Sequence, residues 1–352
     1  MGVFNHNALL EVNQFSISSI EVVKGPASSI YGPEAIGGTV NFIGQRPTTV
    51  PTAKVGIQFN NFGYRRLQFG TGATFGKFGF YLGGLTSRQT NSWLTNSDYD
   101  KTSINSRLEY HFSPKTRLTG TLVYSNYDSQ TGGTADSIAF FSRKYQSNND
   151  FSYRKSKAVR SRLTLEQDWN KNSNTSFTAF FRDNDLGQNP SYRISWKPSK
   201  PNVASGEINS NRFRSYGGLV QHHQKFAFLN SKLIAGALYD YSPNDYDAYY
   251  IALNPELRAD GLSVEKYTIK EERPDSLVSN YNAKINNAAA YLQYDFKPTT
   301  KLTVSVGIRY DNMYFSYQNF IDDNRGSKRY QQFTPKVGAT YNLSETKGFY
   351  AN

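Results

Sequence analysis

Apolar and polar residues alternate along most of this chain, from about residue 53 to the end. Each alternating segment is about eight to fourteen residues long and stops at a break. The clearest one, from 302 to 311, sets apolar residues against polar residues or glycine: Leu302, Val304, Val306, Ile308 and Tyr310 against Thr303, Ser305, Gly307, Arg309 and Asp311. A period of two indicates a β-strand between two different environments. About thirteen such segments predict an all-β fold.

The breaks are of two kinds that alternate along the chain. Every second break is a tight turn with the residues that turns require: 76–77, 113–115, 170–172, 225–229, 298–299 and 344–345. After the first, the breaks between them are longer: 89–100, 128–154, 185–211, 242–284 and 318–330. Outer-membrane barrels have short turns at one end and long loops at the other. We therefore predict one curved antiparallel transmembrane sheet with strands in sequence order, in which Val306 faces lipid and Arg309 faces the lumen.

Composition agrees with a membrane-spanning sheet. The chain has 26 Tyr and 24 Phe but no Cys, and no stretch approaches the roughly 20 apolar residues of a membrane helix. The mean hydropathy is negative, which is compatible with a barrel because only every second residue of a strand meets lipid. Many predicted strands end in an aromatic residue on the apolar face, as interfacial girdles require: Phe112, Tyr124, Trp169, Tyr239, Tyr241, Phe296 and Tyr310.

The net charge of +12 is distributed over the whole length and does not form a block. A protein that binds single-stranded nucleic acid would set stacking aromatics beside Lys and Arg, but here the aromatics share the aliphatic face. We therefore expect no nucleic-acid partner. Basic residues near the predicted strand tops either meet lipopolysaccharide phosphates or are solvated strand ends: Arg154, Lys155, Lys157 and Arg160.

The first fifty residues lack the spacing of membrane strands. We expect short strands at 20–23 and 39–43, one helical turn at 27–31, and glycine and proline turns between them. This small αβ element should lie on the luminal side of the sheet, against residues such as Gln68, Arg107 and Glu109. Six apolar side chains could form its core: Ile20, Val22, Ile30, Ile36, Val40 and Phe42.

The run from 17 to 43 closely resembles the end of the plug domain of TonB-dependent outer-membrane receptors. It matches the pattern in register over a long set of positions: Glu21, Lys24, Gly25, Pro26, Ser28, Tyr31, Gly32, Ala35, Gly37, Gly38, Val40 and Asn41. The resemblance implies that residues 1–50 are the C-terminal part of a plug and that 51–352 are the N-terminal part of a barrel of about 22 strands. No signal peptide is visible. We therefore expect the sequence to be a piece of a longer reading frame.

For function, the resemblance implies active uptake of a scarce ligand, with energy delivered through the TonB complex. An iron–siderophore complex is the leading ligand, with cobalamin, haem or an oligosaccharide as alternatives, and a passive porin as an alternative mechanism. In the family, the basic residue at the position of Lys24 helps lock plug to barrel through buried carboxylates. Lysine lacks the bidentate fork of arginine. A solvated turn residue is the other interpretation of Lys24.

We find no catalytic set, metal site or cofactor motif in the sequence and expect no enzyme. His222 and His223 are adjacent in a predicted strand and so point to opposite faces, which argues against one shared metal ion. His111 is expected on the luminal face with Arg107 and Glu109. Aromatic residues in the predicted loops could contact a ligand or pack on their own loop: Phe140, Phe141, Tyr145, Tyr246, Tyr249 and Tyr250.

Overall fold

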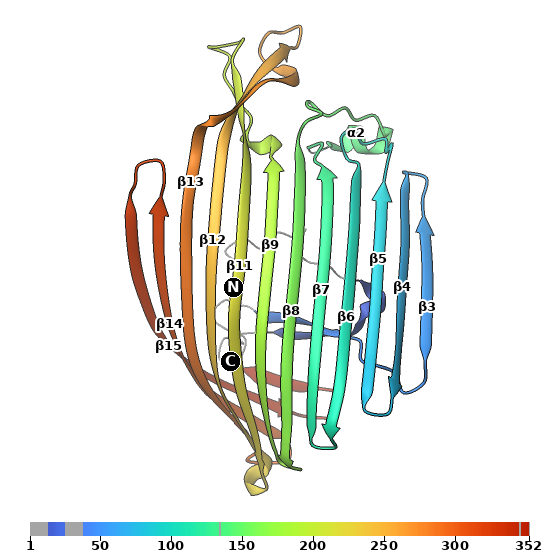
Figure 1. Cartoon of the computed structure of the whole chain (residues 1–352), viewed down its shortest axis with the longest axis vertical. Helices are drawn as coiled ribbons and strands as arrows, with labels where there is room; N and C mark the ends of the chain where they lie inside the picture. The colour runs from blue at the N-terminus through green and yellow to red at the C-terminus, as the bar shows by residue number, and fades with distance from the viewer. Residues whose placement is uncertain (1–12, 25–37, 134, 345, 352) are drawn as a thin grey trace.

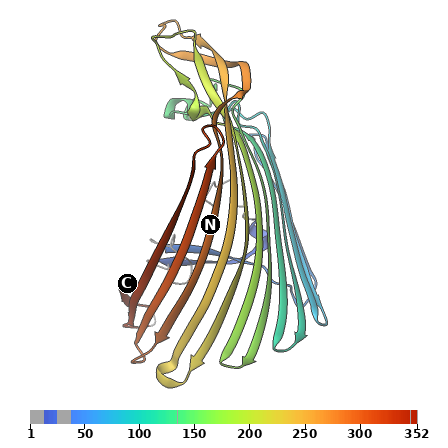
Figure 2. The same ribbon diagram turned by 60° about the vertical axis from the view of Figure 1, so that its left-hand side comes forward.

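The computed structural model describes residues 13–24, 38–133, 135–344 and 346–351. These residues form a large curved antiparallel sheet, here called the wall, and a separate two-stranded sheet that crosses behind it in both ribbon views (Figures 1 and 2). Thirteen strands of the wall follow one another in sequence order: β3 (Thr52–Phe59), β4 (Tyr64–Phe75), β5 (Phe78–Gln89), β6 (Tyr99–Ser113), β7 (Thr116–Gln130), β8 (Tyr153–Asn170), β9 (Ser173–Asn189), β11 (Ala204–Phe226), β12 (Ser231–Leu257), β13 (Val264–Phe296), β14 (Leu302–Asn319), β15 (Arg325–Asn342) and β16 (Gly348–Ala351).

The remaining elements are short. Strand β10 (Ser195–Trp196) pairs with the beginning of β11 and brings the large sheet to 14 strands. The helical pieces are η2 (Gln14–Ser16), α2 (Ser137–Ser142), η3 (Ser191–Arg193) and η4 (Phe228–Asn230). Strands β3 and β16 are the two edges of the sheet and do not pair with each other, so the described wall is an open part of a barrel. The predicted fold class, a partial antiparallel transmembrane barrel, is confirmed.

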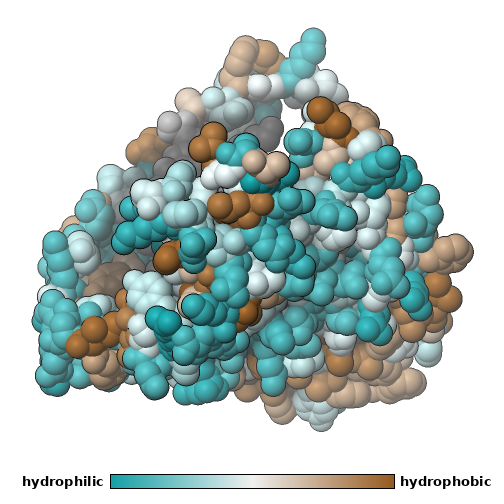
Figure 3. Space-filling model, turned by 90° about the horizontal axis from the view of Figure 1, so that it is seen from above, coloured by the Kyte–Doolittle hydropathy of each residue, from teal (hydrophilic) through white to brown (hydrophobic). Residues whose placement is uncertain are grey.

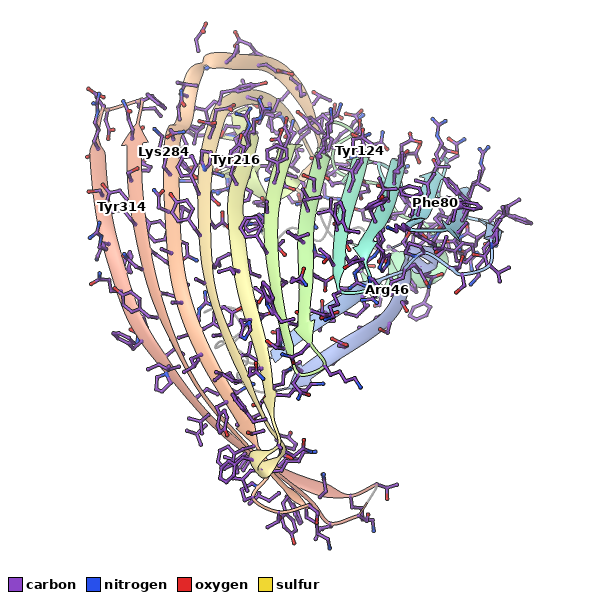
Figure 4. The ribbon with its side chains drawn as sticks, turned by 60° about the horizontal axis from the view of Figure 1, so that its bottom comes forward. Arg46, Phe80, Tyr124, Tyr216, Lys284 and Tyr314 are labelled. Atoms are coloured by element: carbon purple, nitrogen blue, oxygen red, sulfur yellow. The ribbon has the colours of Figure 1, made fainter. Side chains whose placement is uncertain are left out.

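The two faces of the wall differ as the alternation predicts. On β14, Val306 and Ile308 are 44% and 46% exposed on the outer face, whereas Arg309 and Asp311 are 2% and 3% exposed on the inner face. Aromatic residues stand on the outer face of other strands as well, among them Tyr124, Tyr216 and Tyr314, labelled in Figure 4. Outward apolar and inward polar residues are what lipid on one side and a polar lumen on the other require.

Two predicted loops are wrong because the strands continue through them. The break predicted at 242–284 is a hairpin in which β12 runs to Leu257 and β13 starts at Val264. The break predicted at 318–330 shrinks to 320–324. Figure 2 shows the β11–β12–β13 ribbons extending well above the rest of the wall. Above the membrane both faces of a strand meet water or protein, so the contrast between faces disappears while the backbone ladder continues.

Several glycines of the wall lie opposite an aromatic residue of the neighbouring strand. Gly84 pairs with Phe69, and Gly236 pairs with Tyr291. A Cβ added to Gly236 would lie 2.4 Å from the ring of Tyr291, so this ring covers the glycine. Aromatic side chains that cover a cross-strand glycine stabilise curved sheets.

Replacing Gly236 with alanine is expected to destabilise the full-length protein in bilayers by about 1–3 kcal/mol, the usual cost of overpacking. The new methyl group would displace the buried Tyr291 ring, whose hydroxyl accepts a 2.9 Å hydrogen bond from Gln221 Nε2. Denaturant unfolding would measure the change. Gly187→Ala is the matched control because a Cβ there has no atom within 4 Å. Equal unfolding midpoints for both variants would contradict this packing role.

Candidate functional site

The two-stranded sheet lies on the inner side of the wall. It pairs β1 (Ile17–Lys24) with β2 (Gly38–Gly44), close to the strands expected at 20–23 and 39–43. The Tyr81 hydroxyl donates a hydrogen bond to the Phe15 carbonyl oxygen just before β1. A Cβ on Gly83 would lie 2.2 Å from Ser16 Oγ. Because glycine has no side chain, the residues just before β1 can lie close to the wall at this position. The luminal placement expected from the sequence is therefore confirmed.

The expected apolar core of this element is not formed by the residues that the structure describes. Ile20, Val22, Val40 and Phe42 are 44–60% exposed. A hairpin of two short strands has too little surface to bury these side chains by itself. Ile30 and Ile36 and the expected helical turn at 27–31 lie outside the described residues.

Part of the motif that carried the family resemblance is visible in the hairpin. Glu21 pairs with Asn41 in the ladder, and Asn41 Nδ2 donates a 3.2 Å hydrogen bond to Glu21 Oε2. The backbone of Lys24 pairs with Gly38 at the end of the hairpin. The partner of the Lys24 side chain stays a prediction. Val40 also lies in β2. The remaining motif positions lie outside the described residues: Gly25, Pro26, Ser28, Tyr31, Gly32, Ala35 and Gly37.

The inner face of the wall carries charged pairs that form within or between neighbouring strands. Arg107 Nε lies 2.6 Å from Glu109 Oε1, and both side chains are largely buried. His111 Nε2 lies 3.9 Å from Glu109 Oε2, so the predicted luminal set of these three residues is confirmed. Arg309 donates two 2.8 Å hydrogen bonds to the carboxylate of Asp311. These pairs keep charged groups satisfied within the membrane-spanning part.

A larger polar network crosses β9, β11 and β12. Arg182 Nη2 donates 2.6 Å and 2.7 Å hydrogen bonds to Asp240 Oδ2 and Ser215 Oγ. The hydroxyls of Ser215 and Ser242 donate 2.6 Å and 2.8 Å hydrogen bonds to Asp240 Oδ1. No motif or spacing in the sequence marks these four residues as a network. Its members are luminal by alternation, but their partnership depends on strand register.

Two cavities lie between the hairpin and the wall. The larger, of about 690 Å³, is bounded by Phe42 and by residues of β7 to β14, including Arg160, Arg182 and Arg309. The smaller, of about 310 Å³, lies against Ile17, Phe42 and wall residues that include Arg107 and Arg160. The larger cavity has a volume in the range of small-molecule sites.

The loop between β7 and β8 gathers aromatic residues at the extracellular end. Phe140 and Phe141 of α2 are 58% and 82% exposed and meet edge to face, with ring centroids 5.4 Å apart. Trp93 packs on Phe140 from the neighbouring loop, with centroids 6.0 Å apart. The Tyr145 hydroxyl instead donates a hydrogen bond to the Gly132 carbonyl oxygen of its own loop. The structure thus brings Phe140 and Phe141 together on the surface and turns Tyr145 inward.

The other three loop aromatics lie on the extended β12. Tyr246 stacks on Tyr281 of β13, with centroids 5.1 Å apart. The Tyr249 hydroxyl donates a 3.0 Å hydrogen bond to Glu272 Oε2, and burial together with this carboxylate raises the pKa of Tyr249 to about 12. Tyr250 is 45% exposed. Seen from above, hydrophilic side chains cover much of this end, and hydrophobic ones gather along the lower and right-hand margin (Figure 3).

One expectation for the basic residues near the strand tops needs correction. Arg160 lines both luminal cavities, and Arg154 donates a 3.2 Å hydrogen bond to Gln188, so neither meets the outer leaflet. Lys155 lies on the opposite face and pairs with Asp128 at 3.3 Å. Arg154 and Arg160 share the parity of Arg162, so alternation could have assigned them to the lumen.

Among the described residues, no three His, Asp or Glu side chains gather in a way that could hold a metal ion. His222 and His223 occupy consecutive ladder positions on β11, and Thr175 Oγ1 lies 2.9 Å from His222 Nδ1. The described part of the chain also has no helix long and apolar enough to cross a membrane.

A wall that is apolar outside and charged inside, with a separate hairpin against its inner face, defines a plugged transmembrane β-barrel. The model of the TonB-dependent receptor-like β-barrel family matches residues 44–352, and the model of the TonB-dependent receptor plug domain matches residues 2–39. The chain belongs to the TonB-dependent receptor family, and the resemblance inferred from the sequence is confirmed. It is a protein of the outer membrane of Gram-negative bacteria.

Solved structures of siderophore receptors share this fold. The ferric citrate transporter FecA has 15% identity and a TM-score of 0.77 over 96% of this chain and 49% of that one. The siderophore receptor PiuA from Acinetobacter baumannii has 16% identity and a TM-score of 0.74 over 96% and 53%. The ferripyoverdine receptor of Pseudomonas aeruginosa has 18% identity and a TM-score of 0.74 over 94% and 45%. The chain therefore spans about half the length of these proteins.

Proposed function

We propose that this chain is part of a receptor that takes up an iron–siderophore complex across the outer membrane with energy from the TonB complex. The observation that carries the proposal is the β1–β2 hairpin against the inner face of the wall, with cavities between them. A barrel obstructed by a separate element needs that element to move before a ligand can pass. Two proteins of similar fold are the ferric citrate transporter FecA and the ferripyoverdine receptor of Pseudomonas aeruginosa, which supports iron as the cargo.

Within this proposal, residues 1–50 are the C-terminal part of the plug and residues 51–352 the first part of the barrel. Lys24 anchors the plug, and the TonB complex acts on the plug at its periplasmic side. The tight turns of the wall lie at that side, opposite α2 and the β12–β13 extension.

The proposed ligand surface is the extracellular end of the wall. The exposed rings of Phe140, Phe141 and Tyr250 are available to an incoming complex. The side chains of Tyr145, Tyr246 and Tyr249 instead contact other residues of the same loops and strands and stabilise the surface. We further propose that the outer face meets lipopolysaccharide through its upper charged residues. Lys155 and Lys157 occupy outward positions there, and Arg88 pairs with Asp100 at 3.3 Å.

Cobalamin, haem or an oligosaccharide could use the same mechanism, and the described residues do not favour one of them. A passive porin is less consistent with the structure because a porin needs no hairpin of the kind formed by β1 and β2.

The proposal is tested by deleting the full-length gene that contains this segment and following growth under iron limitation. We expect the deletion strain to lose growth on at least one ferric siderophore and to regain it on complementation. Growth with cobalamin, haem and oligosaccharides as the limiting nutrient is measured in parallel. If the deletion strain still grows on every iron chelate but no longer grows on cobalamin, haem or an oligosaccharide, iron is not the cargo. The nutrient on which growth is lost is then the ligand of the receptor.

A further inference from the structure

The outer face of the wall carries charged residues beyond the extracellular end of its apolar part. From β5 to β11 several of them form ion pairs with each other: Arg88 with Asp100 at 3.3 Å, Lys155 with Asp128 at 3.3 Å, and Arg212 and Arg214 with Asp183 at 3.5 Å. In this part of the wall, basic and acidic side chains therefore compensate each other.

Two basic residues follow the apolar part of β13 and β15. On β13 the outward apolar residues end at Ala288, and Lys284 lies two outward positions further toward the extracellular end. On β15 they end at Phe333, and Arg329 follows at the same spacing. Both residues are exposed, and Figure 4 labels Lys284 together with Tyr314 of the intervening strand. The two positive charges therefore flank β14 on the outer face.

Uncharged residues lie next to these two side chains in the ladder. Lys284 lies between Pro243 of β12 and Ser316 of β14. Arg329 pairs with Tyr314, and its guanidinium carbon lies 5.8 Å from the centroid of that ring. A hydroxyl group and an aromatic ring of β14 thus lie between the two basic residues. Lys284, Tyr314, Ser316 and Arg329 are here called the basic patch.

The basic patch has the dimensions and the charge of a phosphate site. Strands β13 and β15 are two strand spacings apart, about 10 Å, a gap that extended lysine and arginine side chains can close around one phosphate group. The patch itself contains no carboxylate. Asp245, two residues beyond Pro243 on β12, accepts a 2.7 Å hydrogen bond from Asn282 Nδ2. The patch therefore attracts anions more strongly than the paired residues of β5 to β11 do.

The outer face below the basic patch is apolar and suits an acyl chain. Ala288 and Ala290 are exposed there. Ala288 pairs with Tyr239 of β12, and Ala290 pairs with Tyr310 of β14, so two small side chains lie between two large rings. A phosphate site directly above an apolar strip matches a phosphorylated lipid. In the outer leaflet of the outer membrane that lipid is lipopolysaccharide, whose lipid A part carries phosphate groups.

We propose that the basic patch binds a phosphate group of lipid A, with an acyl chain of the same molecule lying along Ala288 and Ala290. This inference rests on the proposed contact between the outer face and lipopolysaccharide and assigns that contact a specific site on β13 to β15. It is independent of the ligand that the receptor transports. The paired residues of β5 to β11 should contribute less, because their charges are already compensated.

The test uses the full-length receptor, purified in detergent and freed of lipid. Binding is measured for lipid A with its phosphates, for the same lipid A after chemical dephosphorylation, and for phosphatidylglycerol. The parent receptor should bind phosphorylated lipid A more tightly than the other two lipids. In the K284Q/R329Q variant the affinity for phosphorylated lipid A should fall about tenfold, equivalent to 1.4 kcal/mol. The K284R/R329K variant keeps both charges and should retain most of the affinity.

The matched control is R212Q/R214Q, which removes the same charge from outward arginines that share Asp183 and should bind lipid A as the parent does. The unfolding midpoint of each variant without lipid shows whether it is folded. Parental affinity in K284Q/R329Q, or an equal loss in R212Q/R214Q, would overturn the inference.

The comparison of lipids separates the possible sources of binding. Equal affinity for dephosphorylated lipid A would mean that only acyl chains are bound, and equal affinity for phosphatidylglycerol would assign the patch to phospholipid. Either result contradicts the proposal. If the parent binds no lipid A, the proposed contact with lipopolysaccharide fails as a whole. Iron uptake is tested separately by growth, so the uptake proposal and this inference can fail independently.

Discussion

Asp311→Ala should destabilise the full-length receptor by about 3–5 kcal/mol, the cost of leaving one partner of a buried ion pair alone. Arg309 and Asp311 are 2% and 3% exposed, and two 2.8 Å hydrogen bonds join them. Without the carboxylate, the guanidinium group stays buried with its charge uncompensated. Denaturant unfolding of the receptor in lipid bilayers measures the loss.

Asp323→Ala is the control for this prediction because it breaks a pair of the same chemistry at the surface. Arg325 and Asp323 lie 3.0 Å apart with side chains 66% and 76% exposed, and exposed pairs contribute at most about 1 kcal/mol. The double variant R309M/D311L should be more stable than Asp311→Ala, because it leaves no charge buried. If Asp311→Ala and Asp323→Ala cost the same, the luminal pair is open to water in the complete receptor.

Val306→Arg should destabilise the receptor by about 2–4 kcal/mol, the cost of a charge on the lipid face near the midplane of a barrel. The Val306 side chain is 44% exposed on the outer face. The neighbouring Ser305 occupies the inner face at the same depth, so Ser305→Arg should cost much less. Folding yield and unfolding midpoint in bilayers of fixed thickness distinguish the two variants, and equal effects would mean that the assigned faces are wrong.

The glycine-rich motif identified the family although most of its glycines lie outside the described structure. The described part of the motif lies in the hairpin as expected: Glu21, Lys24, Gly38, Val40 and Asn41. Of the candidate ligand residues, Phe140, Phe141 and Tyr250 present exposed rings, and ligand contact by any of the six stays a prediction. Sequence spacing cannot tell an exposed loop ring from one that packs on its own loop, as Tyr145 does, because both are aromatic residues between strands.

The sequence by itself determined the strands of the wall within the membrane, their order, the tight turns and the faces of residues such as Val306 and Arg309. This was possible because lipid requires apolar side chains and the lumen accepts polar ones, and the two alternate along a strand. The apolar side chain of Val306 therefore predicts the lipid face, and the charged side chain of Arg309 predicts the luminal face. The tertiary structure decided what alternation cannot encode. Register brings Arg182 to Asp240, 58 residues apart in sequence. The β12–β13 extension continues by backbone pairing beyond the membrane, where Ile251 and Leu253 are buried in an apolar cluster with Ala204 and Tyr267. The positions of Arg160 and Arg162 between wall and hairpin likewise arise only when two separate sheets meet.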